Sequence, residues 1–156
     1  MQEVKNIIVI NDFDFINGGT SQIAITTANA LVERGFKVAF FSAVHNKDRK
    51  DLSDEIRLYS THQFDILSHP SRPAAAIQGI WNSKAAEELS LFLKEFNETD
   101  TVIHLHGWIK ALSPSIGKIL VNTKFTVVCT LHDYFIACPN GGFYNFNTNT
   151  ICRLKP

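Results

Sequence analysis

The alternation of apolar runs and polar breaks along the chain predicts strands separated by helices. Residues 7–10 form a short β-branched run, typical of a strand buried on both faces of a parallel sheet. Residues 12–19 interrupt it with polar side chains and two glycines. A helix over about 20–34 follows, with Gly35 as its C-terminal stop. Residues 37–41 predict a second strand, so the start of the chain reads as a strand–loop–helix–strand unit.

The middle of the chain has a weaker pattern. Residues 56–59 and 64–67 each predict a short strand, separated by polar residues. Residues 77–96 predict one long amphipathic helix. The side chains expected on its buried side are Trp81, Leu89, Phe92, Leu93 and Phe96.

The last third returns to regular elements before the pattern ends. Residues 101–105 predict a strand, residues 115–121 a helix and residues 125–131 another continuously apolar strand. After His132 the chain becomes a mixture of aromatic residues, asparagine, glycine and cysteine. No closing element follows, so we expect a further domain outside these residues.

Together these elements predict an α/β fold, a Rossmann-like doubly wound parallel sheet formed by one domain over residues 1–156. Ligands of such open sheets bind outside the carboxyl ends of the strands. Three loops are expected there, each after an apolar strand: residues 12–20, 104–110 and 132–144. They hold the candidate chemistry.

Composition narrows the function classes. The chain has 156 residues, of which 45% are hydrophobic, enough for one domain with a core. Fifteen basic residues balance 15 acidic ones, which gives no electrostatic reason to expect nucleic-acid binding. We expect a cytoplasmic protein, because the start lacks a secretory signal and three cysteines do not form a disulfide framework.

Gly18, Gly19 and Thr20 lie between the first strand and the first helix. Backbone N–H groups at a helix N-terminus favour anions, and glycines let a phosphate approach closely. The loop lacks the Gly-Lys-Ser/Thr of a P-loop and the G-x-G-x-x-G of a dinucleotide site. The second strand also ends without a ribose-binding acid, so a nicotinamide enzyme is not expected. A phosphate site and an ordinary tight turn both remain open here.

Asp12 and Asp14 offer an alternative function. Phosphatases of the haloacid-dehalogenase class place D-x-D after the first strand, with one aspartate as nucleophile and Mg²⁺ beside it. Ser42 after the second strand could imitate their second motif. However, Phe15 and Ile16 stand where that class has Gly-Thr, and no acidic pair follows a later strand.

Metal sites have little support from the sequence. Alternate residues of a strand share a face, so His104 and His106 could point the same way, but no carboxylate or cysteine nearby completes a ligand set. We expect one imidazole in the core and the other in a cleft. Cys138 and Cys152 are either half of a zinc site or two unpaired thiols.

The ordered set of segments resembles the N-terminal domain of family-4 glycosyltransferases, which are retaining enzymes of the GT-B fold. The segments that produce the resemblance span nearly the whole chain: Gly18-Gly19-Thr20, residues 30–38 (Ala-Leu-Val-Glu-Arg-Gly-Phe-Lys-Val), residues 102–107 (Val-Ile-His-Leu-His-Gly), and residues 130–134 (Thr-Leu-His-Asp-Tyr) with Cys138-Pro139 after them. The run from His132 to Pro139 is the most specific of them.

The resemblance implies two Rossmann-like domains that face each other across a cleft. The C-terminal domain, absent from these residues, would hold the UDP- or GDP-sugar donor, and this domain would bind a glycan or lipid-linked acceptor. Gly18, Gly19 and Thr20 match the loop near the donor diphosphate. His132 matches a histidine near the transferred sugar and becomes the candidate catalytic residue.

The remaining matched positions are candidate substrate-binding residues: His106, Gly107, Asp133 and Tyr134. The resemblance further implies no cofactor or divalent metal, and it suggests peripheral contact with the inner membrane face. Glu87 and Glu95 have the E-x7-E spacing of the family's donor site, but the sequence around them indicates a solvated helix face.

Two other functions stay open on the sequence. One is the D-x-D phosphatase, and the other is a non-catalytic domain that binds a saccharide or a protein and kept only the fold.

Overall fold

The structure, a computed structural model, describes residues 3–138 and 140–152. The described strands form a five-stranded sheet and a two-stranded hairpin. The strands are β1 (Asn6–Phe13), β2 (Lys37–Val44), β3 (Arg57–Ser60), β4 (Thr101–Leu105), β5 (Thr126–Cys129), β6 (Tyr144–Asn145) and β7 (Thr150–Ile151). The helices are α1 (Gly19–Glu33), α2 (Arg72–Ile80), α3 (Ser83–Leu93) and α4 (Ser115–Val121).

The larger sheet is entirely parallel, with the strand order β3-β2-β1-β4-β5. This confirms the predicted α/β class with a Rossmann-like parallel sheet. The chain moves from β1 outwards to β3 and then returns to place β4 on the other side of β1. The order therefore reverses between β1 and β4, where open parallel sheets form a crevice for ligands.

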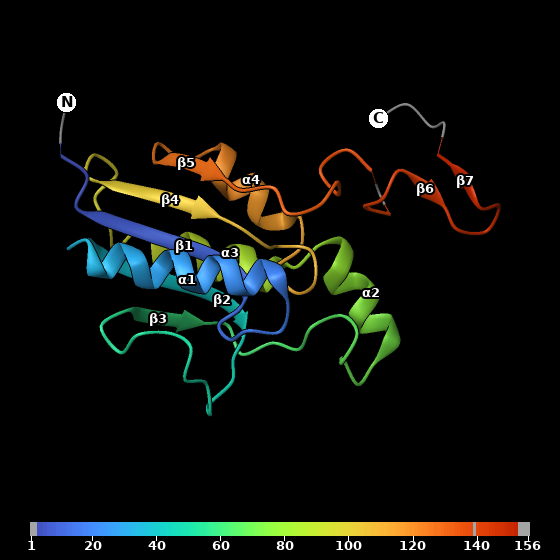
Figure 1. The fold of residues 1–156 in the computed structure, drawn as a ribbon, viewed down its shortest axis with the longest axis horizontal. Helices are drawn as coiled ribbons and strands as arrows, with labels where there is room; N and C mark the ends of the chain where they lie inside the picture. Colours follow the sequence, from blue (N-terminus) through green and yellow to red (C-terminus); the bar gives the residue numbers. More distant parts are fainter. Residues whose placement is uncertain (1–2, 139, 153–156) are drawn as a thin grey trace.

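The central strand β1 feeds two hydrophobic cores, because successive side chains of a strand point to opposite faces. Ile8 and Ile10 pack with α3 and α4. Ile7 and Val9 pack with α1. Figure 1 shows α1 across one face of the sheet, while α3 and α4 lie on the other.

Helix α1 begins and ends close to its predicted limits. Ala24, Ile25 and Ala28 are buried against the sheet. At its end, Gly35 has a φ of 87°, a left-handed conformation that favours glycine, and its N–H donates to the carbonyl of Val32 at 2.8 Å. The predicted C-terminal stop is confirmed, and it turns the chain directly into β2.

The prediction of one helix over residues 77–96 is wrong, because two helices meet there. Trp81 is extended, and Asn82 begins α3 by accepting the N–H of Ala85 at 3.1 Å. The Asn82 side chain also donates to the carbonyl of Ala111 at 2.7 Å, which anchors the break. As a result Trp81, which we expected to be buried, is 46% exposed.

Residues 64–67 do not form the predicted strand. Asp65 accepts the backbone N–H groups of Leu67 at 2.8 Å and Ser68 at 3.1 Å. An aspartate that bonds the backbone two residues ahead closes a turn and competes with strand pairing. The segment becomes a loop that passes the carboxyl end of the sheet and leads into α2.

The first and last strands also differ from their predicted limits. Strand β1 continues to Phe13, so Asp12 lies within the strand and not in the following loop. Strand β5 is shorter than the predicted 125–131, and all four of its residues are exposed although its sequence is apolar. Beyond it, the β6–β7 hairpin lies past the carboxyl ends of the strands, as α2 does (Figure 1). Within the described residues, the helices are too short or too polar to cross a membrane.

Candidate functional site

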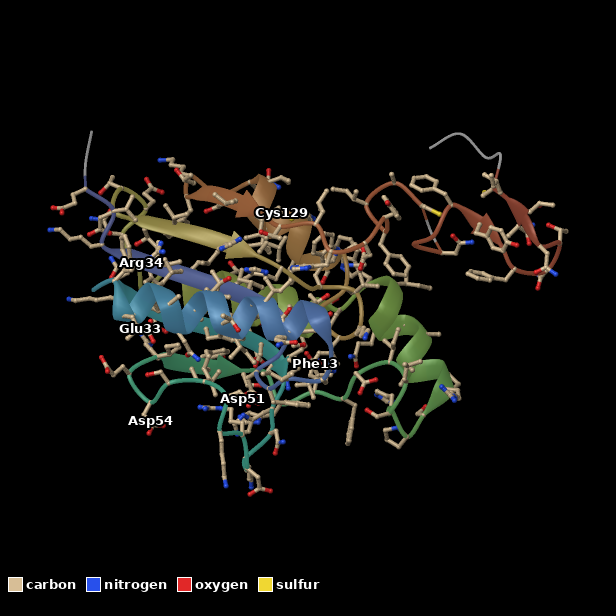
Figure 2. All side chains as sticks on the ribbon, in the orientation of Figure 1. Phe13, Glu33, Arg34, Asp51, Asp54 and Cys129 are labelled. Carbon is tan, nitrogen blue, oxygen red and sulfur yellow. The ribbon has the colours of Figure 1, made fainter. Side chains whose placement is uncertain are left out.

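A cavity opens at the carboxyl ends of β1, β4 and β5, where the strand order reverses. In Figure 2, the labels of Phe13 and Cys129 mark the last residues of β1 and β5. The residues that line the cavity are Asn11, Asp12, Phe13, 17–21, Ile66, Leu67, 106–110, His132, Asp133 and Phe135. The three loops expected from the sequence all contribute to it.

The β1 side of the cavity is a frame of hydrogen bonds. The Asp12 carboxylate accepts the backbone N–H groups of Lys110, Ala111 and Leu112, at 2.9, 2.9 and 2.8 Å. Burial raises the pKa of Asp12, and these three N–H groups oppose that shift. Asn11 accepts the N–H of Gly107 at 3.0 Å. Together the two side chains fix the loop after β4.

Gly107 is required by this close approach. A Cβ atom at this position would lie 2.8 Å from Oδ1 of Asn11 and 3.0 Å from Cγ2 of Thr20. The glycine therefore lets the loop after β4 pass against the first turn of α1. Sequence reasoning assigned Gly107 to substrate binding, and the structure gives it a packing role as well.

The glycines at the start of α1 have a different environment. Gly18 has a φ of 164°, which is ordinary extended backbone, and a Cβ atom at Gly18 or Gly19 would meet nothing within 4 Å. The first turn of α1 receives no side-chain cap and holds no acidic residue. Gly19, Thr20 and Ser21 of this turn line the cavity, and no described side chain accepts their backbone N–H groups, an arrangement that favours an anion.

The β4–β5 side of the cavity presents three histidines. His106 is 2% exposed, and its ring centroid lies 4.1 Å from that of His104 and 5.2 Å from that of His132. Nδ1 of His106 lies 3.0 Å from Nε2 of His132, a hydrogen-bond distance. This ring contact places the imidazoles of His104 and His106 side by side. The sequence led us to expect one imidazole in the core and the other in a cleft. His106, the residue after β4, is both buried and part of the cavity wall, while His104 is half-buried.

Burial sets the charge state of two of these histidines. It lowers the pKa of His106 to about 3, helped by repulsion from His104 and His132. Burial also lowers the pKa of His104, helped by repulsion from His132. Nε2 of His104 lies 2.8 Å from the Thr130 hydroxyl. His106 is therefore a neutral imidazole throughout the physiological range.

The two residues after His132 separate from one another. Asp133 lines the cavity, and its carboxylate accepts the N–H of Phe135 at 3.1 Å. Tyr134 is 60% exposed and packs against Phe143, with ring centroids 5.3 Å apart, and it is not among the residues that line the cavity. The structure thus gathers seven of the eight predicted site residues round one cavity: Gly18, Gly19, Thr20, His106, Gly107, His132 and Asp133.

Several residues of the cavity were not singled out from the sequence. Asn11 had a signal, because a polar residue at the end of a buried strand requires a partner. Asp12 was singled out only as part of the D-x-D motif and not as a wall of this cavity. Ile66, Leu67 and Phe135 had none, since their loops reach the cavity only through the tertiary fold.

The contacts of Asp14 bear on the phosphatase alternative. Its buried carboxylate lies 2.5 Å from Nδ1 of His45 and accepts the N–H of Asn46 at 3.0 Å. With Asp12 bound to the loop after β4, both carboxylates of the D-x-D motif hold backbone loops. Every oxygen of the two carboxylates is engaged in at least one such contact, which disfavours the role of a nucleophile or a Mg²⁺ ligand.

Glu87 and Glu95 do not form a site. Glu87 lies on α3, while Glu95 follows the end of that helix and forms an ion pair with Arg57 at the start of β3. Arg57 marks the amino end of the strands, opposite the cavity.

Cys138 is a buried thiol close to backbone N–H groups. Burial raises its pKa, and the N–H groups of Phe143, Asn140, Gly142 and Gly141 outweigh that effect, so the net pKa is lowered. The N–H of Phe143 lies 3.2 Å from its sulfur. Within residues 3–138 and 140–152, no three side chains among His, Cys, Asp and Glu converge on a metal position.

Comparison with known proteins adds no family assignment. No protein-family model matches the chain, and no curated protein matches it.

Proposed function

We propose that this chain is the acceptor-side half of a retaining glycosyltransferase of the GT-B fold. It would transfer a sugar from a UDP- or GDP-sugar to a glycan or lipid-linked acceptor. The donor would be held mainly by a second domain outside these residues. The observation that supports this most is that the uncapped N-terminus of α1 and the ring of His132 line the same cavity.

The chemistry of sugar transfer fits these two features. A nucleotide-sugar donor loses a diphosphate through an oxocarbenium-like state, and negative charge grows on the leaving group. Backbone N–H groups at Gly19 and Thr20 would stabilise that charge, and His132 would contact a sugar oxygen. Lys110, which lines the cavity, would add a positive charge near the diphosphate. The resemblance implies that no divalent metal takes part.

The acceptor side offers apolar surface. Ile66 and Leu67 line the cavity, and α2 beside them exposes Ile77 and Ile80, 69% and 75% respectively. Exposed aliphatic residues on a helix next to a binding cavity support a lipid-linked acceptor and peripheral contact of a cytoplasmic enzyme with a membrane. Sedimentation with phospholipid vesicles should be lost in an Ile77→Ser, Ile80→Ser double variant and kept in Val121→Ser, which changes an exposed valine on α4.

The test of the proposed activity uses the natural full-length polypeptide. It is incubated with UDP-, GDP- and ADP-sugars, and release of the nucleoside diphosphate is measured. We expect release from one donor and its loss in His132→Ala. Absence of both release and donor binding would overturn the proposal and leave the non-catalytic binding domain. Phosphate release that requires Mg²⁺ and is lost in Asp12→Asn would favour the phosphatase instead.

A further inference from the structure

Three imidazoles and one hydroxyl form a row from β5 to the cavity. The Thr130 hydroxyl contacts Nε2 of His104 at 2.8 Å, and the His104 ring lies against the His106 ring. Nδ1 of His106 then meets Nε2 of His132 at 3.0 Å, with the two ring planes only 25° apart. Nearly coplanar rings at this distance share one N–H···N hydrogen bond. Which ring donates it depends on where the proton of His106 lies.

The surroundings of Nε2 of His106 decide where that proton lies. Its Nε2 is fully buried and has no hydrogen-bond partner among the described residues. A neutral imidazole has one N–H and one lone pair, so one of these must occupy that site. A buried N–H without an acceptor is rarer and costlier than an unused lone pair. The His106 proton therefore belongs on Nδ1, where His132 accepts it.

We propose that His106 is a positioning residue that fixes the tautomer of His132. Nε2 of His132 accepts the bond from His106, so the single proton of neutral His132 lies on Nδ1. His132 lines the cavity, and no described residue bonds its Nδ1. His132 therefore offers the substrate a hydrogen-bond donor and not a base.

The inference rests on the proposed function and names the group that His132 would meet. An N–H donor recognises an oxygen acceptor, here a sugar hydroxyl or a diphosphate oxygen. It cannot remove a proton from an acceptor hydroxyl. His132 would thus hold the donor sugar or its leaving group, and deprotonation of the acceptor would fall to another group.

The opposite arrangement is disfavoured by the same contacts. If His132 donated from Nε2, the proton of His106 would move to its own Nε2, where no described residue accepts it. A charged His106 would carry protons on both nitrogens. The low pKa of His106, which is caused mainly by burial, disfavours this charged state. His106 therefore donates its Nδ1–H to Nε2 of His132.

Two variants separate positioning from packing. His106→Phe keeps a ring against His104 but removes the N–H donor. His106→Asn loses the ring but keeps a side-chain N–H close to the place of Nδ1. A purely structural role predicts that the phenylalanine variant resembles the wild type more closely, whereas a positioning role predicts this of the asparagine variant.

The measurement is ¹⁵N NMR of the imidazole nitrogens at neutral pH. The signals of His132 are identified by their loss in His132→Ala, because the chain has five other histidines. We expect a protonated Nδ1 and a bare Nε2 in the wild type and in His106→Asn. In His106→Phe we expect both nitrogens to show averaged signals from two tautomers. A protonated Nε2 in the wild type, or an unchanged tautomer in His106→Phe, would overturn the proposal.

A kinetic readout connects the tautomer to turnover. In the full-length polypeptide, His106→Phe should lower kcat by about tenfold with little change in donor KM, and His106→Asn should lose less. If the NMR result holds and no sugar is transferred from any donor, the proposed function fails while the tautomer assignment stands. If sugar is transferred but the NMR result fails, only the role of His106 is overturned.

Discussion

The two sides of the cavity use their polar groups in opposite ways. On the β1 side, Asp12 and Asp14 are buried, and their oxygens bond to the loops after β4 and β2. On the β4–β5 side, His106 leaves one nitrogen without a partner among the described residues, and His132 keeps one for the cavity. Both sides have burial and polar chemistry, but the two aspartates are engaged by loops, whereas the two histidines keep nitrogens that no described residue bonds.

This difference separates a frame from a reactive surface. A carboxylate that accepts several backbone N–H groups holds a loop in place and has little left for a substrate. An imidazole with a free nitrogen can still donate or accept. The D-x-D motif, which looks most like catalytic chemistry in the sequence, is therefore the scaffold, and the histidines opposite it are the candidates for reaction.

The largest expected effect tests the frame. Replacing Asp12 by alanine leaves the N–H groups of Ala111 and Leu112 buried without an acceptor, and that of Lys110 unbonded. We expect the free energy of unfolding to fall by about 3–5 kcal/mol, since each buried unsatisfied donor costs about 1–3 kcal/mol. Urea unfolding followed by circular dichroism measures it.

Asp14→Ala is the matched comparison, because it removes the other aspartate of the motif. Its partners His45, Asn46 and Arg49, the last with Nε 3.8 Å from the carboxylate, are only half-buried and can turn to water. We expect a loss of about 1–2 kcal/mol. If Asp14→Ala lowered the free energy of unfolding more than Asp12→Ala, the loop after β2 would depend on its aspartate more than the loop after β4 does. The frame would then not be specific to the cavity.

The second expected effect concerns the histidine side of the cavity and is a change in the free energy of unfolding with pH. The pKa of His106 is near 3 in the folded chain, against an ordinary value of 6.5 in the unfolded chain. Below pH 6.5 the unfolded chain takes up a proton that the folded chain refuses, so stability falls as the pH falls towards 3. Between pH 7 and 4.5, His106 should account for a loss of about 2–3 kcal/mol.

Removing the imidazole isolates this contribution. His106→Asn should lose less stability than the wild type over the same pH interval, whatever its stability at pH 7. The two free energies of unfolding are measured in urea at each pH. Parallel pH profiles would show that His106 can be protonated in the folded chain, and the contrast between the two sides of the cavity would weaken.

The sequence was sufficient for the elements whose cause is local. The β-branched run of β1 and the stop at Gly35 depend on residues within one turn or strand, and the structure confirms both. The break at Asn82 had a local signal as well, since Asn-Ser can begin a helix. Its anchor is the carbonyl of Ala111, 29 residues away, which no local pattern reveals.

The site was predictable to a similar degree. Strand order at the carboxyl edge explains why the loops near Gly18, Gly107 and His132 meet, and the sequence pattern anticipated that edge. The contact between His106 and His132 follows from the pairing of β4 with β5, which the sequence does not state. The roles of Asp12 and Asp14 likewise depend on partners in distant loops.

The smallest expected effect on stability is at Gly18, just before α1, which forms the edge of the cavity between its two sides. Gly18→Ala adds a methyl group where nothing lies within 4 Å, in a backbone conformation that alanine adopts freely. The free energy of unfolding should change by less than about 0.5 kcal/mol. Gly107→Ala is the control: its methyl group would meet Asn11 at 2.8 Å, and we expect a loss of about 1–3 kcal/mol.

The pair of glycines also separates space kept for a ligand from space needed for folding. If a diphosphate approaches the first turn of α1, Gly18→Ala should weaken donor turnover in the full-length polypeptide while thermal unfolding stays unchanged. Loss of turnover together with loss of stability would assign Gly18 to the frame, as Gly107 is. Unchanged turnover with unchanged stability would mean that no ligand uses this edge, and the anion would have to bind elsewhere in the cavity.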